Sequence, residues 1–440
     1  MNYHPKIIKA LSRYERKNRD TEPPAKFPLL EAFKTVHPSE GLFSDVDALF
    51  IQHHLGDLIP HIEAMVPEGL DRCRCWFADI PYSTNEMVRG LLETRGYKCE
   101  HMTGFFSDPL EDYDSSQSSR ITYFMQRLAQ RDSPKPLLVI DDGGHFVRFL
   151  KSAILHAPDL IPAFQGSYVV EQTTRGHRFL KKYKSDVVEP CKLSVVSIAR
   201  CYTKKNYESP FVGEAVSRAL VHAVGEDRLA DMRYVAVIGF GAVGRATVSQ
   251  LTKWTKRALI DIVDIDEEAL RCASSFKSHS GNRCRGLKEL AANRQYELVV
   301  GCTGYNSFRI DQRGLLADDA ILASGSSAAV EFNRTGFIEL ADRRPDDEIR
   351  ILNRIRTRKK GIHAPIVFSH EGRKTFCFLN AGFPINFDGH LECMPAQFIQ
   401  ATHCLLYAAS LQALQEKPAG LNKIREEYDK WIFKNALDEL

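Results

Sequence analysis

Three glycines between residues 234 and 266 have the spacing of a loop that binds a dinucleotide. Gly239, Gly241 and Gly244 form a G-x-G-x-x-G sequence directly after the apolar, β-branched run Tyr234–Ile238. Such a run is typical of a strand that is buried on both faces. The first glycine allows a tight turn, the second lets the backbone approach a pyrophosphate, and the third lets the helix and the strand pack closely. The sequence therefore predicts that a dinucleotide binds at this turn.

The residues after the glycine loop supply the rest of this predicted site. An amphipathic stretch at 245–256 predicts a helix, and the free N–H groups where it begins, including those of Ala242 and Val243, are the expected ligands of the pyrophosphate. A second apolar run, 258–263, ends at Asp264, roughly 20 residues after the glycines, where a carboxylate accepts hydrogen bonds from the adenosine ribose. An acid at this position favours NAD over NADP. The alternative is a turn of the same kind that has lost its cofactor.

Polar side chains also follow three apolar runs in the first half of the chain. The runs are residues 136–140, 166–170 and 193–198, and the polar residues after them include Asp142, Thr173 and Lys204. Strands that alternate with helices form parallel sheets, in which ligands bind beyond the carboxyl ends of the strands. We therefore expect Asp142, Thr173 and Lys204 to lie at the ligand-binding edge of such a sheet.

The elements that position these residues predict an α/β protein. Further strands are expected at 74–78, 97–101, 298–303 and 320–324, helices at 83–94, 121–131, 209–224 and 395–414, and an acidic surface loop at 108–119. We expect an α/β substrate domain at 1–208, an inserted Rossmann-type NAD-binding domain with a parallel sheet at 209–385, and a C-terminal return segment with a helical tail at 386–440.

The composition agrees with a protein of the cytoplasm that has more than one domain. The chain has 440 residues, of which 44% are hydrophobic, and this is enough for two or three sizeable cores. A net charge of +3 does not suggest a nucleic-acid partner. The polar N-terminus predicts no signal peptide, and no apolar run approaches the length of a membrane span. The eleven cysteines are expected to be reduced thiols.

Two groups of residues resemble other kinds of site and are interpreted as structural. His390, Cys393, His403 and Cys404 look superficially like a set of metal ligands, but packing of a loop and a helix explains them better, so no metal is expected. The basic run at 354–360 is expected to be a solvated loop rather than a phosphate site.

Four stretches of the chain follow one another in a characteristic order. They are DDGG at 141–144, EQTTRGHRFL at 171–180, TKKNYES at 203–209 and DID at 264–266. Weaker matches are CTG at 302–304 and FPIN at 383–386, which is followed by Gly389 and His390. In order and spacing, these stretches resemble the S-adenosyl-L-homocysteine hydrolase family over most of residues 70–415. The resemblance implies a substrate domain, an inserted Rossmann domain and a C-terminal return.

The resemblance also implies a chemistry and the residues that perform it. In the family, bound NAD oxidises a ribose hydroxyl, a base removes the proton that the ketone acidifies, the thiol leaves, water adds, and the ketone is reduced again. Lys204 matches the lysine that polarises and deprotonates the hydroxyl, and Asp142 matches a strand-end aspartate. Glu208 stands in place of the aspartate that follows the lysine, and His390 is the match for the active-site histidine.

For the cofactor, the resemblance implies contacts from outside the glycine loop. Thr173 and Thr174 match threonines that contact the nicotinamide ribose, and Asn386 matches an asparagine that binds the carboxamide. Thr303 and Gly304 belong to the loop that is T-T-G in the family. The substrate is expected to be nucleoside-like and the chain to form a homodimer or a higher homo-oligomer, with no nucleic acid and no membrane as partners.

The chain departs from the family mainly where the substrate binds. Gln172 stands where the family has a glutamate, and Ala199 and Ser209 stand where it has asparagines. The segment 80–84 stands for H-M-T-I-Q but lacks its threonine and histidine, and 421–440 has no match for the lysine and tyrosine that reach a neighbouring subunit's NAD. We therefore expect hydrolysis of adenosylhomocysteine itself to be slow or absent.

Three interpretations of the function stay open at this point. The first is an NAD-dependent, adenosylhomocysteinase-like enzyme that acts by redox-assisted elimination, hydrolysis or oxidation on a different nucleoside or related substrate. The second is an NAD(H)-dependent oxidoreductase whose cofactor exchanges, which the missing C-terminal residues favour. The third is a non-catalytic NAD-binding regulatory homologue, which the loss of a carboxylate at Gln172 favours.

Overall fold

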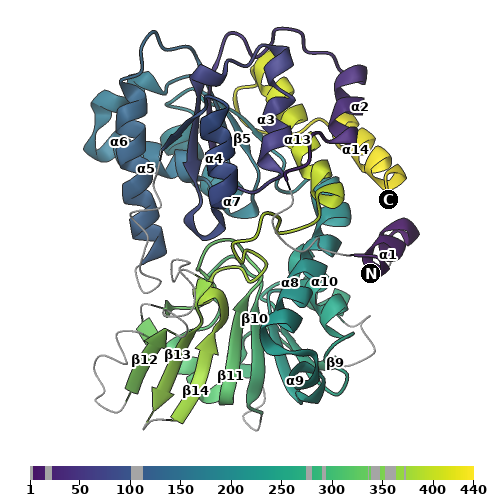
Figure 1. Ribbon diagram of the computed structural model, residues 1–440. Coiled ribbons are helices and arrows are strands. Elements are labelled where there is room, and N and C mark those ends of the chain that lie inside the picture. The colour runs from purple at the N-terminus through teal and green to yellow at the C-terminus, as the bar shows by residue number, and fades with distance from the viewer. Residues whose placement is uncertain are drawn as a thin grey trace. The chain divides into compact units, whose positions relative to one another are not determined.

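The computed structural model describes residues 3–14, 22–100, 112–273, 280–289, 294–334, 336–337, 347–351, 363–370 and 373–440. Helices and strands alternate along the chain, and the fold is α/β (Figure 1). The chain forms two compact units. Unit 1 comprises Met1–Tyr14, Phe106–Tyr113 and Ser209–Asp388, and unit 2 comprises Glu15–Phe105, Asp114–Glu208 and Gly389–Leu440.

Unit 2 contains a seven-stranded sheet in the order β15-β6-β5-β4-β1-β2-β3, in which every neighbouring pair is parallel. Its strands are β1 (Asp47–Gln52), β2 (Cys75–Asp79), β3 (Lys98–Glu100), β4 (Leu137–Asp141), β5 (Tyr168–Glu171), β6 (Ser194–Ser197) and β15 (Gly420–Lys423). The strand order reverses between β1 and β4, because the chain continues from β1 to one side and from β4 to the other. Such a switch point is where ligands bind in open parallel sheets.

Helices lie on both sides of this sheet (Figure 1). The core on one side joins the strands to α5 (Tyr113–Ala129), α6 (His145–His156) and α7 (Thr174–Lys182). The long helix α13 (Ala396–Glu416) packs along β5 and β6, and it also contacts α2 (Pro28–Val36) and α14 (Glu426–Asp438). Every residue of β1 and of β4 is buried, as expected for strands that are covered on both faces. Two shorter helices are α3 (Leu58–Glu63) and α4 (Glu86–Thr94).

Unit 1 contains an eight-stranded sheet in the order β12-β13-β14-β11-β10-β7-β8-β9. Its strands are β7 (Tyr234–Ile238), β8 (Leu259–Val263), β9 (Ser280–Cys284), β10 (Tyr296–Gly301), β11 (Leu316–Ser324), β12 (Asp347–Ile351), β13 (Ile366–His370) and β14 (Arg373–Phe378). The strands β14, β11, β10, β7, β8 and β9 are paired in parallel, and β13 is antiparallel to both β12 and β14. Numbered along the chain, the parallel strands follow the order 3-2-1-4-5-6 of dinucleotide-binding sheets.

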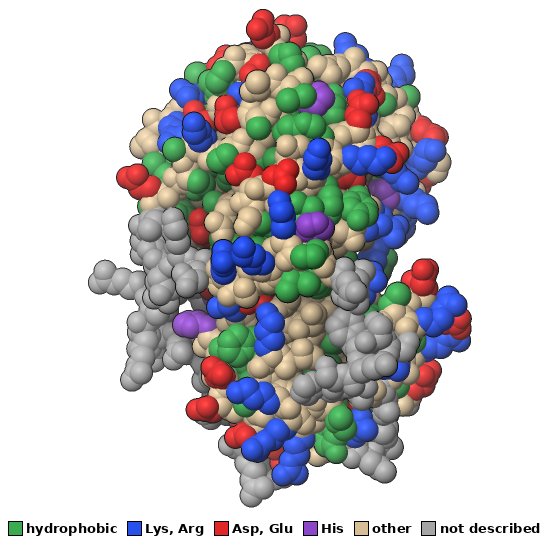
Figure 2. Space-filling model, turned by 90° about the vertical axis from the view of Figure 1, so that its right-hand side faces the viewer, with side chains coloured by type: hydrophobic (Ala, Val, Ile, Leu, Met, Phe, Trp, Pro, Cys, Tyr) green, Lys and Arg blue, Asp and Glu red, His purple; other side chains and the backbone are tan. Residues whose placement is uncertain are grey.

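The helices of unit 1 are α1 (Pro5–Ser12), α8 (Ser209–Val224), α9 (Glu226–Asp231), α10 (Ala242–Leu251) and α11 (Glu267–Ala273). Helices α8 and α10 pack closely because Gly213 has no side chain: a Cβ there would lie 2.5 Å from the backbone carbon of Ala246. On the face shown in Figure 2, Lys and Arg side chains are interspersed with Asp and Glu.

Several details differ from the sequence-based expectations. Residues 113–119, which were expected to belong to a surface loop, form the start of α5, whose serines and Asp114 lie within the helix. Strands β1, β9, β12, β13 and β15 were not predicted, and α10 begins at Ala242 rather than 245. The basic run 354–360 lies outside the described residues. Within the described residues, no helix is long and apolar enough to cross a membrane, and no group of three or more His, Cys, Asp or Glu side chains is arranged to hold a metal ion.

The buried histidine His54 makes the stability of unit 2 depend on pH. Its side chain is buried, neither ring nitrogen has a hydrogen-bond partner among the described residues, and burial lowers its pKa from 6.5 to about 4. Because the unfolded chain then binds the proton more tightly, the stability contributed by neutral His54 is present above pH 6.5 and is lost as the pH falls towards 4. Between pH 7 and pH 5 this group alone lowers the free energy of unfolding by about 2 kcal/mol.

Urea unfolding of the His54→Leu variant at pH 7 and pH 5 tests this prediction. We expect the variant to lose less stability on acidification than the natural protein. A matched control is His156→Leu, which replaces an exposed histidine at the end of α6. An unchanged pH dependence in His54→Leu would contradict the prediction.

Candidate functional site

The switch point of unit 2 brings together a histidine and an aspartate. Strands β1 and β4 lie side by side, with Ile51 opposite Asp141, and the N–H of Asp142 donates to the carbonyl of Ile51 over 2.9 Å. The residues that follow the two strands are therefore His53 and Asp142. Nε2 of His53 lies 3.5 Å from Oδ2 of Asp142, and both side chains are largely buried. Sequence reasoning found Asp142 but missed His53, because strand β1 was not recognised.

Burial dominates the protonation of this pair. It raises the pKa of the Asp142 carboxyl, although the nearby His53 and Lys204 act in the opposite direction, and it lowers the pKa of His53, which Asp142 partly offsets. Nδ1 of His53 is hydrogen-bonded to the hydroxyl of Ser83, which fixes the ring. Burial thus moves the pKa of each group towards its neutral form, and such perturbed pairs are typical of sites of general acid–base catalysis.

Lys204 and Glu208 form an ion pair in the segment that follows β6. Nζ of Lys204 donates to Oε1 of Glu208 over 2.7 Å, and only 14% of the lysine side chain is exposed. The charges of both residues act on Asp142. The three predicted catalytic residues Asp142, Lys204 and Glu208 thus lie in one electrostatic cluster with His53, which we call the acid–base cluster. Neighbouring Lys205 is exposed.

The backbone at Lys204 is helical. Residues Lys204–Glu208 form a single π-helical turn, so that residues four apart in sequence lie on the same side. This turn, rather than the alternation of an extended strand, is what turns Lys204 towards Glu208. Strand β6 ends at Ser197, and a turn at residues 199–200 precedes the lysine.

Asp429 of helix α14 holds this segment in place. Its carboxylate accepts hydrogen bonds from the N–H of Tyr202 over 2.6 Å and the N–H of Thr203 over 3.0 Å, and from the Thr203 hydroxyl over 2.6 Å. Both Thr203 and Asp429 are buried. The C-terminal helix therefore positions Lys204, a role that the polar sequence of the tail did not reveal.

A second buried carboxylate, Glu171, joins the loops after β4 and β5. It accepts from the N–H and the hydroxyl of Thr173, each over 2.7 Å, and from the N–H of Gly144 over 3.1 Å. A Cβ at Gly176 would lie 2.1 Å from Glu171, and a Cβ at Gly144 would lie 2.8 Å from Cα of Gly176. These close approaches explain physically why the segments DDGG and EQTTRG carry glycines at these places.

The other predicted residues of unit 2 lie around these loops. Thr173 is the N-cap of α7, since its hydroxyl accepts from the N–H of Gly176, and Thr174 is exposed at the first position of the helix. Gln172 carries a buried side-chain oxygen with no partner among the described residues. His390 lies half-buried in the irregular segment before α13, and its part in the site stays a prediction.

In unit 1 the glycine loop lies where β7 ends, at the switch point between β7 and β10. Gly239 has a φ of 94°, and a Cβ there would lie 2.7 Å from the backbone of Cys302. A Cβ at Gly244 would lie 1.9 Å from the carbonyl oxygen of Gly239, so both positions require glycine. At Gly241, in contrast, nothing lies within 4 Å of a Cβ. This open space adjoins the first turn of α10, which begins with Ala242 and Val243 and has no side-chain cap.

Asp264 follows β8 and contacts the glycine loop directly. Its Oδ2 accepts the N–H of Phe240 over 2.5 Å, and its Oδ1 accepts the N–H of Asp266 over 2.9 Å. Because Phe240 stands between the first two glycines of the loop, the carboxylate lies beside the turn where the ribose of a dinucleotide binds.

The loop after β10 depends on Glu331, which sequence reasoning missed. Oε1 of Glu331 accepts the N–H groups of Thr303 and Gly304, each over 2.6 Å, and the carboxylate also accepts the hydroxyls of Ser307 and Ser326. Burial raises the pKa of Glu331, which is fully buried, against these hydrogen bonds. In the sequence, Glu331 is marked only as an acid within a run of small and apolar residues.

Asn386 lies at the same edge of unit 1. The preceding residue, Ile385, donates its N–H to the carbonyl of Ser324 at the end of β11 over 2.9 Å. The side chain of Asn386 is buried and forms no hydrogen bond with the described residues. It therefore has an amide available beside the carboxyl ends of the strands, as the cofactor prediction requires.

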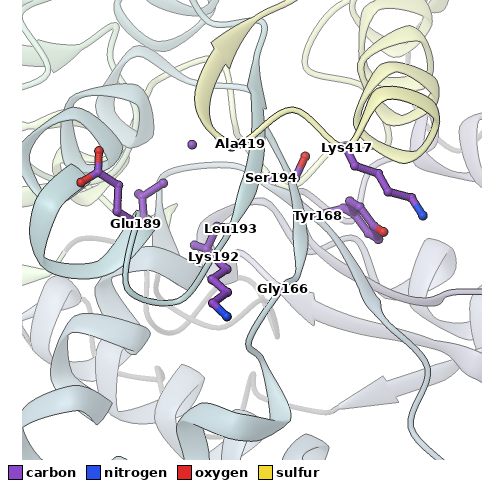
Figure 3. A pocket seen from close by; sticks show the side chains of 10 residues that line it. Gly166, Tyr168, Glu189, Lys192, Leu193, Ser194, Lys417 and Ala419 are labelled. Atoms are coloured by element: carbon purple, nitrogen blue, oxygen red, sulfur yellow. The ribbon is translucent and has the colours of Figure 1, made fainter.

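A cavity of about 350 Å³ lies elsewhere in unit 2 and contains none of the predicted residues. Tyr168, Ser194 and Gly420, the first residues of β5, β6 and β15, are paired in register and line the cavity. Figure 3 shows Ser194 between Glu189 and Lys417. The cavity is thus at the amino edge of the sheet, opposite to the edge that carries the acid–base cluster. The cavity therefore does not coincide with the predicted functional site.

Comparison with known proteins gives relatives but no family. No family model matches the chain. Two proteins from strains of Mycobacterium tuberculosis, both described as uncharacterized, are 25% identical to it over 400 residues, which is 89% of this chain and 68% of each relative. The similarity therefore extends across both units.

The role of Asp429 predicts a specific effect of its removal. In Asp429→Ala the N–H groups of Tyr202 and Thr203 lose their buried acceptor, so we expect their amide hydrogens to exchange faster and the free energy of unfolding of unit 2 to fall by about 3 kcal/mol. Glu427→Ala is the control, because Glu427 is exposed on the same helix. Unchanged exchange at Tyr202 and Thr203 would show that Asp429 does not hold this segment.

Proposed function

We propose that this chain is an NAD-binding, adenosylhomocysteinase-like enzyme of the cytoplasm. It acts by redox-assisted elimination, hydrolysis or oxidation on a nucleoside or related small molecule that differs from adenosylhomocysteine. The observation that carries the proposal is the glycine loop: it lies at the switch point of a 3-2-1-4-5-6 sheet and leaves open space at Gly241 beside the start of a helix. The proposal includes assembly into a homodimer or a higher homo-oligomer.

The residues of unit 1 fit an NAD molecule. The uncapped first turn of α10 offers N–H groups to a pyrophosphate, and the space beside Gly241 lets the pyrophosphate reach them. Asp264 would accept from the adenosine ribose, and the unpaired amide of Asn386 would bind the carboxamide. Bound NAD would supply reversible acceptance of a hydride from a substrate carbon.

The residues of unit 2 support the acid–base part of the proposal. Lys204 would donate a hydrogen bond to a substrate hydroxyl and take its proton after passing one of its own to Glu208, whose Oε1 is 2.7 Å away. The His53–Asp142 pair would be a second acid–base group, because burial has moved the pKa of each towards its neutral form. The proposal requires both functions to act on one substrate.

The two alternative functions differ from this proposal in how NAD is held and used. Copurified NAD that survives dialysis supports the adenosylhomocysteinase-like enzyme. A site that binds and releases NADH freely supports an oxidoreductase with an exchangeable cofactor. The unpartnered amide of Gln172 stands where the resemblance implies a carboxylate, and it favours the non-catalytic homologue if no substrate reduces bound NAD. The absorbance spectrum of the purified protein distinguishes the first two cases.

The position of Asp264 predicts a preference for NAD over NADP. Its carboxylate would accept from the 2′-hydroxyl of NAD and would repel the phosphate that NADP carries there. Asp264→Ala should weaken NAD binding by about 2–3 kcal/mol and should reduce the preference. Isothermal titration of both cofactors at one salt concentration measures this, with Asp266→Ala as a control that removes a neighbouring exposed carboxylate. Equal or tighter binding of NADP by the natural protein would refute the assignment.

The acid–base cluster predicts that Lys204 is the most sensitive residue for activity. Lys204→Met should slow the reduction of bound NAD by a nucleoside substrate about 10²–10⁴-fold, the contribution of a general base. Lys205→Met is the matched control, because Lys205 is exposed and Lys204 is largely buried. NADH absorbance measures both. If Lys205→Met loses activity and Lys204→Met does not, the assignment of the lysine is wrong, and if neither matters, the proposed mechanism does not apply.

A further inference from the structure

Three basic side chains gather around His177 in unit 2. His177 lies in the second turn of α7, and its Nδ1 is 3.0 Å from the hydroxyl of Ser197, the last residue of β6. Lys423, the last residue of β15, is paired in register with Ser197. Lys181 lies one helical turn after His177, and Arg200 follows β6. We call Lys181, Arg200, Lys423 and His177 the basic cluster.

The basic side chains of this cluster lack the acidic partners that other cations of unit 2 have. Within the described residues, the side chains of Lys181, Arg200 and Lys423 form no ion pair and no hydrogen bond. Other cations nearby are paired: Arg175 with Asp114, Lys151 with Asp186, Lys184 with Glu189. The three cations that act on His177 therefore have no acidic partner among the described residues.

His177 reports this excess of positive charge. Partial burial, followed by the charges of Arg200, Lys181 and Lys423, lowers its pKa. Every charged group that acts on this ring is a cation. Since Nδ1 faces Ser197, the other ring nitrogen, Nε2, is available for a hydrogen bond to a ligand. A bound anion would accept from that nitrogen and would relieve the repulsion among the three cations.

We infer that the basic cluster binds the phosphate group of a small phosphorylated molecule. A phosphate monoester carries close to two negative charges at neutral pH and several acceptor oxygens, which match one guanidinium, two ammonium groups and an imidazole N–H. A carboxylate has one charge and fits fewer of these donors. All three cations act on a single ring, and this favours one phosphate group over a polyanion. The inference does not depend on NAD or on the acid–base cluster.

Titration of the ¹⁵N-labelled full-length protein with inorganic phosphate tests the inference by NMR. We expect saturable shifts of the His177 ring signals at millimolar phosphate, and tighter binding of inorganic pyrophosphate. The double variant Lys181→Ala/Lys423→Ala should weaken phosphate binding at least about tenfold, because two charge-assisted contacts are lost. The matched control is Lys182→Ala, which removes the next cation along α7 and should bind phosphate as the natural protein does.

Two controls make the result decisive. Potassium chloride at equal ionic strength should not reproduce the shifts, and acetate should bind more weakly than phosphate. The inference is overturned if chloride has the same effect as phosphate, if acetate binds as well, or if the double variant binds phosphate unchanged. Because all the substituted lysines are exposed, we expect the variants to fold, and their amide spectra verify this in the same experiment.

Discussion

The parallel pairing of β1 with β4 determines the chemistry that unit 2 can perform. In a parallel sheet every strand ends at the same edge, and the side chains that follow the strands meet there. In open parallel sheets a crevice lies at the point where the strand order reverses, and in unit 2 that point is between β1 and β4. His53 and Asp142 occupy that place because each follows directly after one of the two strands. Unit 1 repeats the same arrangement with β7 and β10, and there the residues are those of the glycine loop and of the loop that begins at Cys302.

Loops at such an edge have backbone N–H groups without partners in the sheet, and in this chain buried carboxylates satisfy them. Glu171 accepts from the loops after β4 and β5, Glu331 from the loop after β10, and Asp429 from the segment before Lys204. A buried carboxylate is stable only where several donors surround it, so each of these acids fixes the loop that supplies the donors. The loops of the candidate sites are therefore held by acids that accept hydrogen bonds from the protein backbone.

How much of this was predictable follows from the range of each interaction. The glycine loop, Asp264 and the strand-end position of Asp142 were predicted, because local sequence sets turn geometry and the apolar runs show where strands end. His53 was missed because the short run DALFIQ, with a polar residue at each end, was not recognised as a strand. Glu331 and Asp429 were missed for a different reason, because each accepts hydrogen bonds from a distant part of the sequence. Asp429 bonds a segment more than two hundred positions away, and nothing near it in the sequence indicates that partner. The π-helical turn at Lys204 was also missed, since no local pattern specifies it.

The residues of the acid–base cluster also depend on one another through their charges. Lys204 and Glu208 carry opposite charges and form an ion pair. The net charge that the two residues present to a substrate therefore depends on whether this pair is intact. The charge of Lys204 lowers the pKa of Asp142 and that of Glu208 raises it, so the pair acts on Asp142 nearly as a dipole. Burial then decides the balance and raises the pKa of Asp142 despite His53. If Lys204 passed a proton to Glu208, both charges would vanish together, so the step that prepares Lys204 as a base would leave the balance at Asp142 nearly unchanged.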